Sequence, residues 1–228
     1  MNYIIYKLYN KMFLILIVIF IINILGLISY ILNNQYFNIN KYVNDNIKNI
    51  VVIGDSLGTG YGLRDTDDIW VNKLKDKLDN TYNIINFSKN DRTTGEAIKI
   101  VENSLFINPE VIIIMLGGND ALQNLSIRNM KNNFKKMIEM CLERDIEVVF
   151  VGIPIPFKMK DKNGWTDEYM EEYVQTFYKI SEEYDIIFVK DFLEMKEGNM
   201  SLYLLDDDVH INRYGQQLIT DTIFKYIY

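Results

Sequence analysis

A serine set among glycines is the first place where this sequence could do chemistry. Residues 51–62 read VVIGDSLGTGYG, so three apolar residues lead into Gly54, Asp55 and Ser56, and further glycines follow. Glycines in such a loop either let a phosphate approach the backbone or let the chain turn sharply. The segment is therefore either a nucleotide-phosphate loop or a turn that presents Ser56 as a nucleophile.

The phosphate-loop interpretation lacks its partner residues. A P-loop requires a lysine directly after its last glycine, and the chain has no lysine between Lys48 and Lys73. A short-chain dehydrogenase has a similar glycine spacing but needs a catalytic Tyr-x-x-x-Lys, and the one match runs from Tyr3 to Lys7, ahead of a long apolar segment. The sequence thus favours Ser56 as a nucleophile.

A nucleophilic serine needs a general base, and the chain has 1 histidine, His210. Asp207 precedes it by three residues in LLDDDVH, a spacing at which a carboxylate in a short loop can hydrogen-bond one ring nitrogen. The other nitrogen is then free to take the serine proton. A lone histidine can instead be structural, and three successive aspartates can form a solvated loop.

An asparagine follows the most apolar segment of the chain. Residues 111–116 read VIIIML and run directly into Gly117, Gly118, Asn119 and Asp120. Two glycines and an asparagine can form an ordinary turn. At the carboxyl edge of a sheet, however, the Asn119 amide is a suitable donor to a developing oxyanion, because its NH2 group is neutral and does not compete as a base.

Together these segments resemble the SGNH (GDSL) esterase–lipase superfamily. The resemblance extends from about residue 49 to the C-terminus and rests on Gly54-Asp55-Ser56-Leu57, Gly117-x-Asn119-Asp120, and Asp207-x-x-His210 followed by Gly215. It implies that Ser56 is the nucleophile and that Asp207 and His210 supply acid and base. It also implies that the oxyanion is held by the Ser56 N–H, the Asn119 side chain and a glycine N–H from a second block.

The second block departs from the family pattern. In NFSKNDRTT, Asp91 stands where the family usually has glycine, Asn90 is the alternative donor, and Thr93 matches the usual threonine. Only a backbone N–H is needed there, and Asp and Asn adopt left-handed conformations more readily than most residues. A carboxylate near an oxyanion would nevertheless oppose it, so the departure bears on the second donor and on the rate.

The rest of the chain supplies the elements that must position these residues. Short apolar runs alternate with segments of helical spacing, as in a parallel sheet covered on both faces. We predict helices at residues 70–78, 94–105, 127–142, 167–184 and 213–228, and strands at 49–53, 83–87, 111–116, 148–153 and 186–189. This order predicts an α/β fold, a three-layer α/β/α sandwich with a five-stranded parallel, flavodoxin-like sheet. The loops after 53 and 116 should share one edge of that sheet.

The N-terminal segment is predicted to be a membrane anchor. Residues 12–32 carry no charge, which is the length and polarity of a transmembrane helix. A buried core helix would rarely be apolar on every side, and a cleaved signal peptide would have a shorter apolar run and a small-residue cleavage site. Lys7 and Lys11 favour a cytoplasmic N-terminus, although Lys41 and Lys48 weaken the asymmetry. We expect a cytoplasmic tail and signal-anchor at 1–33, a polar tether at 34–48, and a single-pass protein of the cell membrane whose hydrolase domain, 49–228, lies outside the cytoplasm.

Composition narrows the function classes. The formal net charge of −7 argues against nucleic-acid binding, and the single cysteine, Cys141, allows no intramolecular disulfide and no lipid-modified cysteine at the anchor. We expect no metal and no cofactor. The predicted function is a membrane-anchored serine esterase acting on a lipid, short-chain or O-acetyl glycan ester. An O-acyltransferase with the same triad and a catalytically silent, membrane-tethered binding module are the alternatives.

Overall fold

The computed structural model of the chain describes residues 16–17, 19–25, 47–78, 82–155, 159–194, 199 and 201–227. The chain divides into two compact units, Met1–Lys41 and Tyr42–Tyr228, and the predicted site residues lie in the second. Most of the predicted span 12–32 and of the tether 34–48 falls outside the described residues. Among the residues that are described, no helix is both long and apolar enough to cross a membrane.

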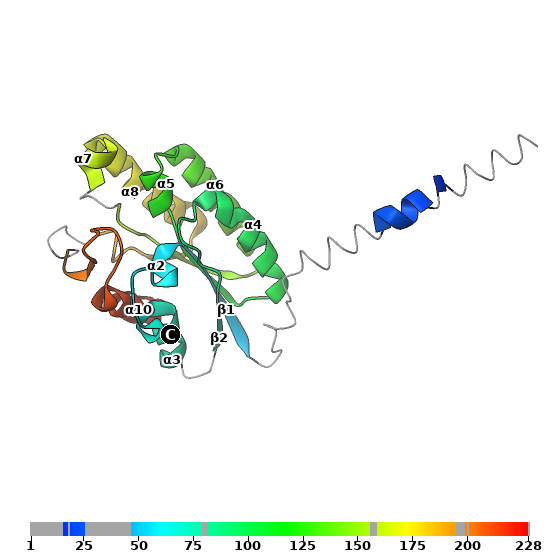
Figure 1. Ribbon diagram of the computed structural model, residues 1–228, viewed down its shortest axis with the longest axis horizontal. Coiled ribbons are helices and arrows are strands. Elements are labelled where there is room, and N and C mark those ends of the chain that lie inside the picture. The colour runs from blue at the N-terminus through cyan, green and yellow to red at the C-terminus, as the bar shows by residue number, and fades with distance from the viewer. Residues whose placement is uncertain are drawn as a thin grey trace, which may run out of the picture. The chain divides into compact units, whose positions relative to one another are not determined.

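The second unit is built on a five-stranded parallel sheet (Figure 1). The strand order is β2-β1-β3-β4-β5, with β1 (Lys48–Gly54), β2 (Tyr82–Asn86), β3 (Val111–Met115), β4 (Glu147–Val151) and β5 (Ile187–Val189). Every residue of the central strand β3 is buried, as its uninterrupted apolar sequence requires in a sheet covered on both faces. The predicted flavodoxin-like sheet is confirmed, and the sequence placed each strand correctly to within about two residues.

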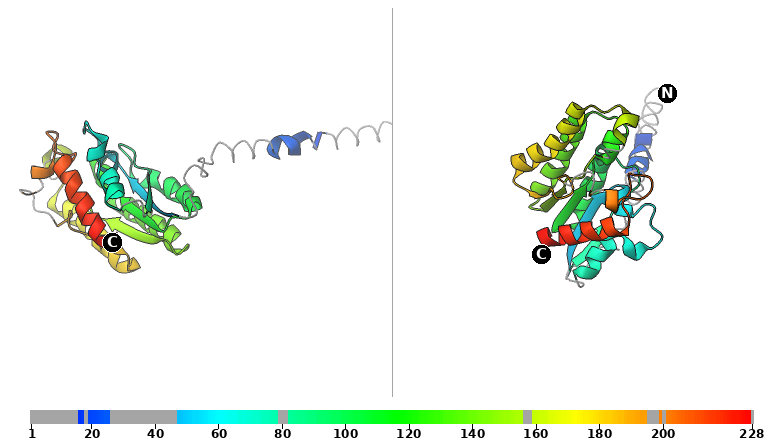
Figure 2. Two further views of the ribbon diagram at one scale, coloured as in Figure 1. Left: turned by 90° about the horizontal axis from the view of Figure 1, so that it is seen from below. Right: turned by 90° about the vertical axis from the view of Figure 1, so that its left-hand side faces the viewer.

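Helices cover both faces of the sheet. Figures 1 and 2 show α4 (Thr94–Ser104), α6 (Ile127–Leu142) and α8 (Asp167–Tyr184) on one face, and α3 (Trp70–Lys77) and α10 (Arg213–Ile227) on the other. The predicted three-layer arrangement therefore holds. The apolar residues whose helical spacing predicts α6 are also the residues that the helix buries. These are Met130, Phe134, Met137, Ile138 and Cys141.

Several short elements between the longer helices and strands are not visible in the sequence pattern. These are α2 (Ser56–Thr59), α5 (Gly118–Leu122), α7 (Lys160–Asn163) and the 3-10 turns η2 (Thr66–Asp68), η3 (Leu105–Ile107) and η5 (Ser201–Tyr203). A single helical turn is too short to show a 3.6-residue period, so its position cannot be predicted from periodicity. Two of these turns, α2 and α5, carry predicted site residues.

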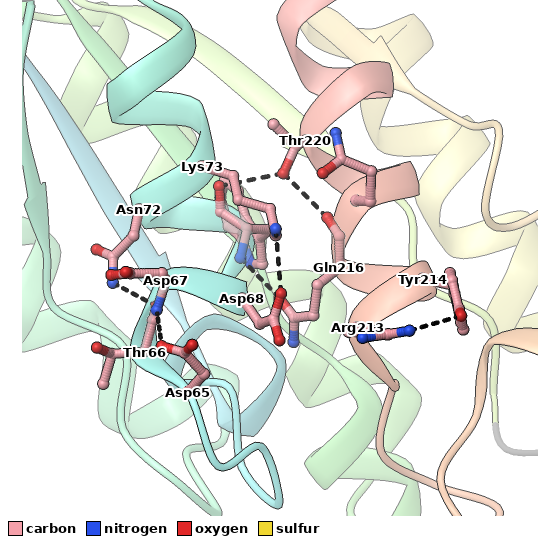
Figure 3. Close-up of polar contacts among 12 residues, drawn as sticks. Asp65, Thr66, Asp67, Asp68, Asn72, Lys73, Arg213, Tyr214, Gln216 and Thr220 are labelled. Carbon is pink, nitrogen blue, oxygen red and sulfur yellow. Dashed lines mark hydrogen bonds and ion pairs between the residues drawn. The ribbon is translucent and has the colours of Figure 1, made fainter.

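Gln216 connects α10 with α2 and α3 by hydrogen bonds. Its buried side chain accepts a hydrogen bond from the Trp70 N–H at 2.8 Å and donates to the Leu57 carbonyl oxygen at 3.4 Å. The Thr220 hydroxyl lies 3.3 Å from the carbonyl oxygen of Trp70. It also lies 3.0 Å from the carbonyl oxygen of Gln216, as Figure 3 shows. These bonds hold the C-terminal helix, and the segment that leads into it, beside the turn that carries Ser56.

Candidate active site

Ser56 begins the short helix α2 directly after β1. Asp55 caps this helix, because its Oδ1 accepts a hydrogen bond from the Leu57 N–H at 3.0 Å and its carbonyl oxygen accepts one from the Gly58 N–H at 3.1 Å. The chain thus passes from strand to helix with only Asp55 between them. Ser56 is half-buried and reaches the carboxyl edge of the sheet, where flavodoxin-like folds bind ligands.

Packing explains two of the glycines in this loop. A Cβ atom at Gly58 would lie 2.1 Å from the Ser88 hydroxyl oxygen, and one at Gly62 would lie 2.6 Å from a methyl group of Leu205. Gly62 also has a φ of +81°, which side chains disfavour. Close contacts with the protein therefore account for these glycines, and no bound phosphate is needed to explain them.

His210 and Asp207 form the predicted pair. The His210 ring nitrogen Nδ1 lies 2.7 Å from Asp207 Oδ2, while Asp207 Oδ1 accepts hydrogen bonds from the backbone N–H groups of Val209 and His210. Burial alone would raise the pKa of Asp207, but the hydrogen bonds from His210 and Val209 outweigh it and lower that pKa. A charged carboxylate can only accept, so the proton of the neutral ring resides on Nδ1 and Nε2 is left with its lone pair.

Asn119 lies at the start of α5, one strand away from Ser56. The residue is buried, and its Nδ2 donates to Asp55 Oδ2 at 3.3 Å and to the Arg92 carbonyl oxygen at 3.2 Å. The strands β1 and β3 are direct neighbours, so the residues that follow them are brought together. Asn119 therefore lies beside the turn that carries Ser56.

The second block, residues 87–93, forms the next wall of the site. Asp91 has a φ of +60°, the left-handed conformation that explains why glycine is usual at this position. Its carbonyl oxygen accepts from the Gln123 side chain at 3.4 Å. Asn90 faces another way, since its Oδ1 accepts a 2.5 Å hydrogen bond from the Thr59 hydroxyl. The buried Arg92 side chain donates to the carbonyl oxygens of Phe87 and Gly54 and ties this loop to β1.

A cleft gathers these residues at the carboxyl edge of the sheet. Its walls are made by Asp55, Ser56, Leu57, Asp91, Gly118, Asn119, Leu122, Ile153, Pro154, Val209 and His210. It therefore holds a serine hydroxyl, an imidazole and a side-chain amide together, and acyl transfer by a serine nucleophile needs groups of these kinds. Of the two candidates for the second oxyanion donor, Asp91 borders the cleft and Asn90 does not.

Three residues at the site were not assigned a role from the sequence. Asp55 and Arg92 contact Asn119, and the ring of Tyr61 lies against the ring of His210 with a centroid distance of 4.4 Å. Asp55 and Tyr61 belong to the same glycine-rich segment as Ser56, but their contacts with residues over 60 positions away are visible only in the fold.

An apolar cavity adjoins the cleft. The cavity shares four wall residues with the cleft, namely Leu57, Ile153, Pro154 and Val209. The rest of its lining is also mostly apolar and includes Phe192, Leu218 and Ile219. This cavity can accept an apolar group of a molecule whose reacting atom lies in the cleft.

The residues that the structure describes contain no group of three or more His, Cys, Asp or Glu side chains that could hold a metal ion.

Comparison with known proteins gives a consistent result. The model of the GDSL-like Lipase/Acylhydrolase family matches residues 52–218. An arylesterase of Vibrio mimicus is 25% identical over 178 residues, covering 76% of this chain and 85% of that protein. Esterase TesA of Pseudomonas aeruginosa is 24% identical over 179 residues, with 77% and 85% covered.

A solved structure extends this similarity to the fold. The psychrotrophic esterase EstA from Pseudoalteromonas sp., in a structure inhibited by monoethylphosphonate, superposes with a TM-score of 0.66 at 25% identity. The match covers 80% of this chain and 97% of that one.

Proposed function

The chain belongs to the GDSL-like lipase/acylhydrolase family and is a carboxylic ester hydrolase, and from this premise we propose that it is a membrane-anchored serine esterase acting through Ser56, His210 and Asp207. The observation that carries the proposal is the cleft that Ser56, Asn119 and His210 line together, with the His210 ring bonded to Asp207 over 2.7 Å.

In the first half of the proposed reaction, Ser56 Oγ attacks the ester carbonyl carbon. His210 Nε2 takes the serine proton, and Asp207 stabilises the imidazolium that forms. The carbonyl oxygen becomes an oxyanion that accepts hydrogen bonds from the Ser56 N–H, the Asn119 amide and the Asp91 N–H. The C–O bond to the alcohol then breaks, and the alcohol leaves with the proton from His210.

In the second half, water replaces the alcohol. His210 Nε2 removes a proton from a water molecule as the water attacks the acyl-enzyme. The same donors hold the second oxyanion, and its collapse releases the carboxylic acid and restores Ser56. The reaction uses one water molecule per ester, and no redox partner enters.

The apolar cavity favours a substrate whose acyl group is longer than acetyl. A chain bound there would be removed from water at a gain of about 0.8 kcal/mol for each buried CH2 group. Leu57 and Val209 line both the cavity and the cleft that contains Ser56, which supports the proposal that an acyl group attached to Ser56 extends into the cavity. We therefore propose an aliphatic acyl ester, such as a lipid ester, ahead of an O-acetyl glycan.

A series of aryl esters of increasing acyl length tests this proposal. We expect Leu218→Trp, which narrows the cavity, to lower kcat/KM by roughly tenfold or more for longer acyl groups and to leave the acetyl ester unchanged. Leu142→Trp is the matched control, because Leu142 is exposed at the end of α6 and away from the cavity lining. An unchanged chain-length profile in Leu218→Trp would exclude the cavity as the acyl site.

Replacing Asp91 by glycine should leave activity unchanged or raise it. Only the backbone N–H of Asp91 is needed in the proposed oxyanion site, and the change removes both a negative charge and a strained φ of +60°. The measurement is kcat/KM on an aryl ester together with Tm. Asp145→Gly is the matched control, since Asp145 is exposed, has a φ of +57° and does not border the cleft. A large loss of activity in Asp91→Gly alone would give the carboxylate a positive role.

We also propose that residues 12–32 anchor the enzyme, with the hydrolase domain outside the cytoplasm. The support comes from the sequence, in which this uncharged segment follows Lys7 and Lys11. Protease added to intact protoplasts should degrade the domain, which should sediment with membranes before digestion. A mature form released from the membrane with its N-terminus near residue 33 would instead establish a cleaved signal peptide.

A further inference from the structure

The Asp55 carboxylate is a buried charge site between the nucleophile and the oxyanion donor. Asp55 is only 2% exposed to solvent. Oδ1 accepts the Leu57 N–H at 3.0 Å in the turn that carries Ser56, and Oδ2 accepts the Asn119 Nδ2 at 3.3 Å. One carboxylate thus contacts both halves of the site, although the proposed reaction uses neither of its oxygens.

From these contacts we infer that Asp55 is a positioning residue, which holds the Asn119 amide with its NH2 group, and not its carbonyl oxygen, available to the oxyanion. The inference rests on the proposed role of Asn119 as an oxyanion donor. It adds to that role the reason why the amide has a single orientation.

The orientation follows from the acceptors around Asn119. Its Nδ2 faces two oxygens that can only accept, Oδ2 of Asp55 and the carbonyl oxygen of Arg92. A flipped amide would place its own carbonyl oxygen against both, so the flip is strongly disfavoured. The two bonds, at 3.3 and 3.2 Å, are longer than the usual 2.9–3.0 Å. The NH2 group is therefore held in place, yet it can redirect a hydrogen toward an oxyanion that forms in the cleft.

The groups around Asp55 do not offset the free-energy cost of burying its charged carboxylate. Burial raises the pKa of Asp55 to about 6, against the opposing effects of the Leu57 N–H and the His210 ring, and the Asp120 carboxylate raises it further. Arg92 and the Tyr173 hydroxyl also lie within electrostatic range. Because the folded pKa exceeds the unfolded one, the stability linked to this group is present at acid pH and is lost as the pH rises through about 6. Above that pH the charged form of Asp55 destabilises the fold, so its presence calls for a functional reason.

Asp55→Asn, made in the full-length protein, separates the role of Asp55 as the cap of α2 from its role as the acceptor for Asn119. Asparagine keeps an oxygen for the Leu57 N–H and is as good a helix cap as aspartate. It cannot satisfy Asn119 as well, because its remaining NH2 group meets the Nδ2 donor of Asn119. We expect kcat on an aryl ester to fall by roughly tenfold or more, with KM little changed, while Tm at about pH 8 stays equal or rises. Asp65→Asn is the matched control, since Asp65 caps η2 in the same way with its side chain exposed and should lose no activity.

A double mutant shows whether Asp55 acts through Asn119. If it does, Asp55→Asn should cost little more in an Asn119→Ala background, because the amide it orients is already gone. Asp55→Ser retains the cap but cannot reach Asn119, so it should behave like Asp55→Asn. It provides a second variant in case Asp55→Asn does not fold. Unchanged kcat in both Asp55 variants, full additivity with Asn119→Ala, or a loss of activity that only parallels a fall in Tm would each overturn the inference. Full activity in Asn119→Ala alone would instead contradict the proposed oxyanion site, so the two failures can be told apart.

Discussion

His210→Ala should be as inactive as Ser56→Ala, each losing roughly a millionfold in kcat, because nucleophile and base act as a unit and their losses do not add. His210 is the 1 histidine of the chain, so no second imidazole can replace it. Asp207→Ala should retain more activity than either, since the imidazole survives and loses only its orientation and the carboxylate that stabilises its charge. The measurement is kcat on an aryl ester for the single and double variants.

The control for this series is Asp206→Ala. Asp206 stands next to Asp207 and carries the same charge, but the hydrogen bond to the His210 ring comes from Asp207. Asp208 is a poorer control, because it has a φ of +60° and borders the apolar cavity. Labelling by a fluorophosphonate gives a second readout, since only an activated serine reacts. Activity in His210→Ala with none in Ser56→Ala would mean that another group serves as the base.

The pH dependence of the rate follows from the same pair. Burial opposes the charged form of Asp207, but the hydrogen bonds from His210 and Val209 outweigh it and lower its pKa, so the carboxylate stays charged at neutral and mildly acid pH. The contribution of Asp207 to kcat should therefore be constant over that range and be lost only as the pH falls through its lowered pKa, and this acid loss should be absent from the activity that remains in Asp207→Ala.

The sheet could be predicted because its strands are short, apolar and separated by amphipathic helices. Val111–Met115 is apolar at every position, which predicts a strand covered on both faces, and the structure buries all five residues. The common position of Ser56 and Asn119 at the carboxyl edge of the sheet could be predicted for a related reason, because each lies within a few residues of the end of a recognisable strand.

What the sequence could not show are the contacts between distant segments. Asp55 and Asn119 are 64 positions apart, and the hydrogen bond between them depends on the pairing of β1 with β3. The choice between Asp91 and Asn90 depended on one backbone turn, which directs the Asn90 side chain to Thr59 and leaves Asp91 beside the cleft. A local pattern cannot resolve such a turn, because both residue types tolerate the left-handed conformation.

Asn119→Ala should lower kcat by about a hundred- to a thousandfold, the usual loss for one oxyanion donor, which corresponds to roughly 2.7–4 kcal/mol of transition-state stabilisation. The amide is neutral and its hydrogen bonds in the resting site are long, so its strongest interaction should form only when charge develops on the substrate oxygen. For that reason KM should change far less than kcat. The variant should stay folded, which Tm will report.

Asn72→Ala is the matched control for this change. The Asn72 side chain likewise donates to a neighbour, the Thr66 carbonyl oxygen at 2.8 Å, but it does not border the cleft (Figure 3). It should cost stability at most and leave kcat unchanged. Near-normal turnover in a folded Asn119→Ala protein would reduce Asn119 to a turn residue that satisfies Asp55 and Arg92. The oxyanion would then have to be held by backbone N–H groups alone, and the Asp91 N–H would become the donor on which the rate depends.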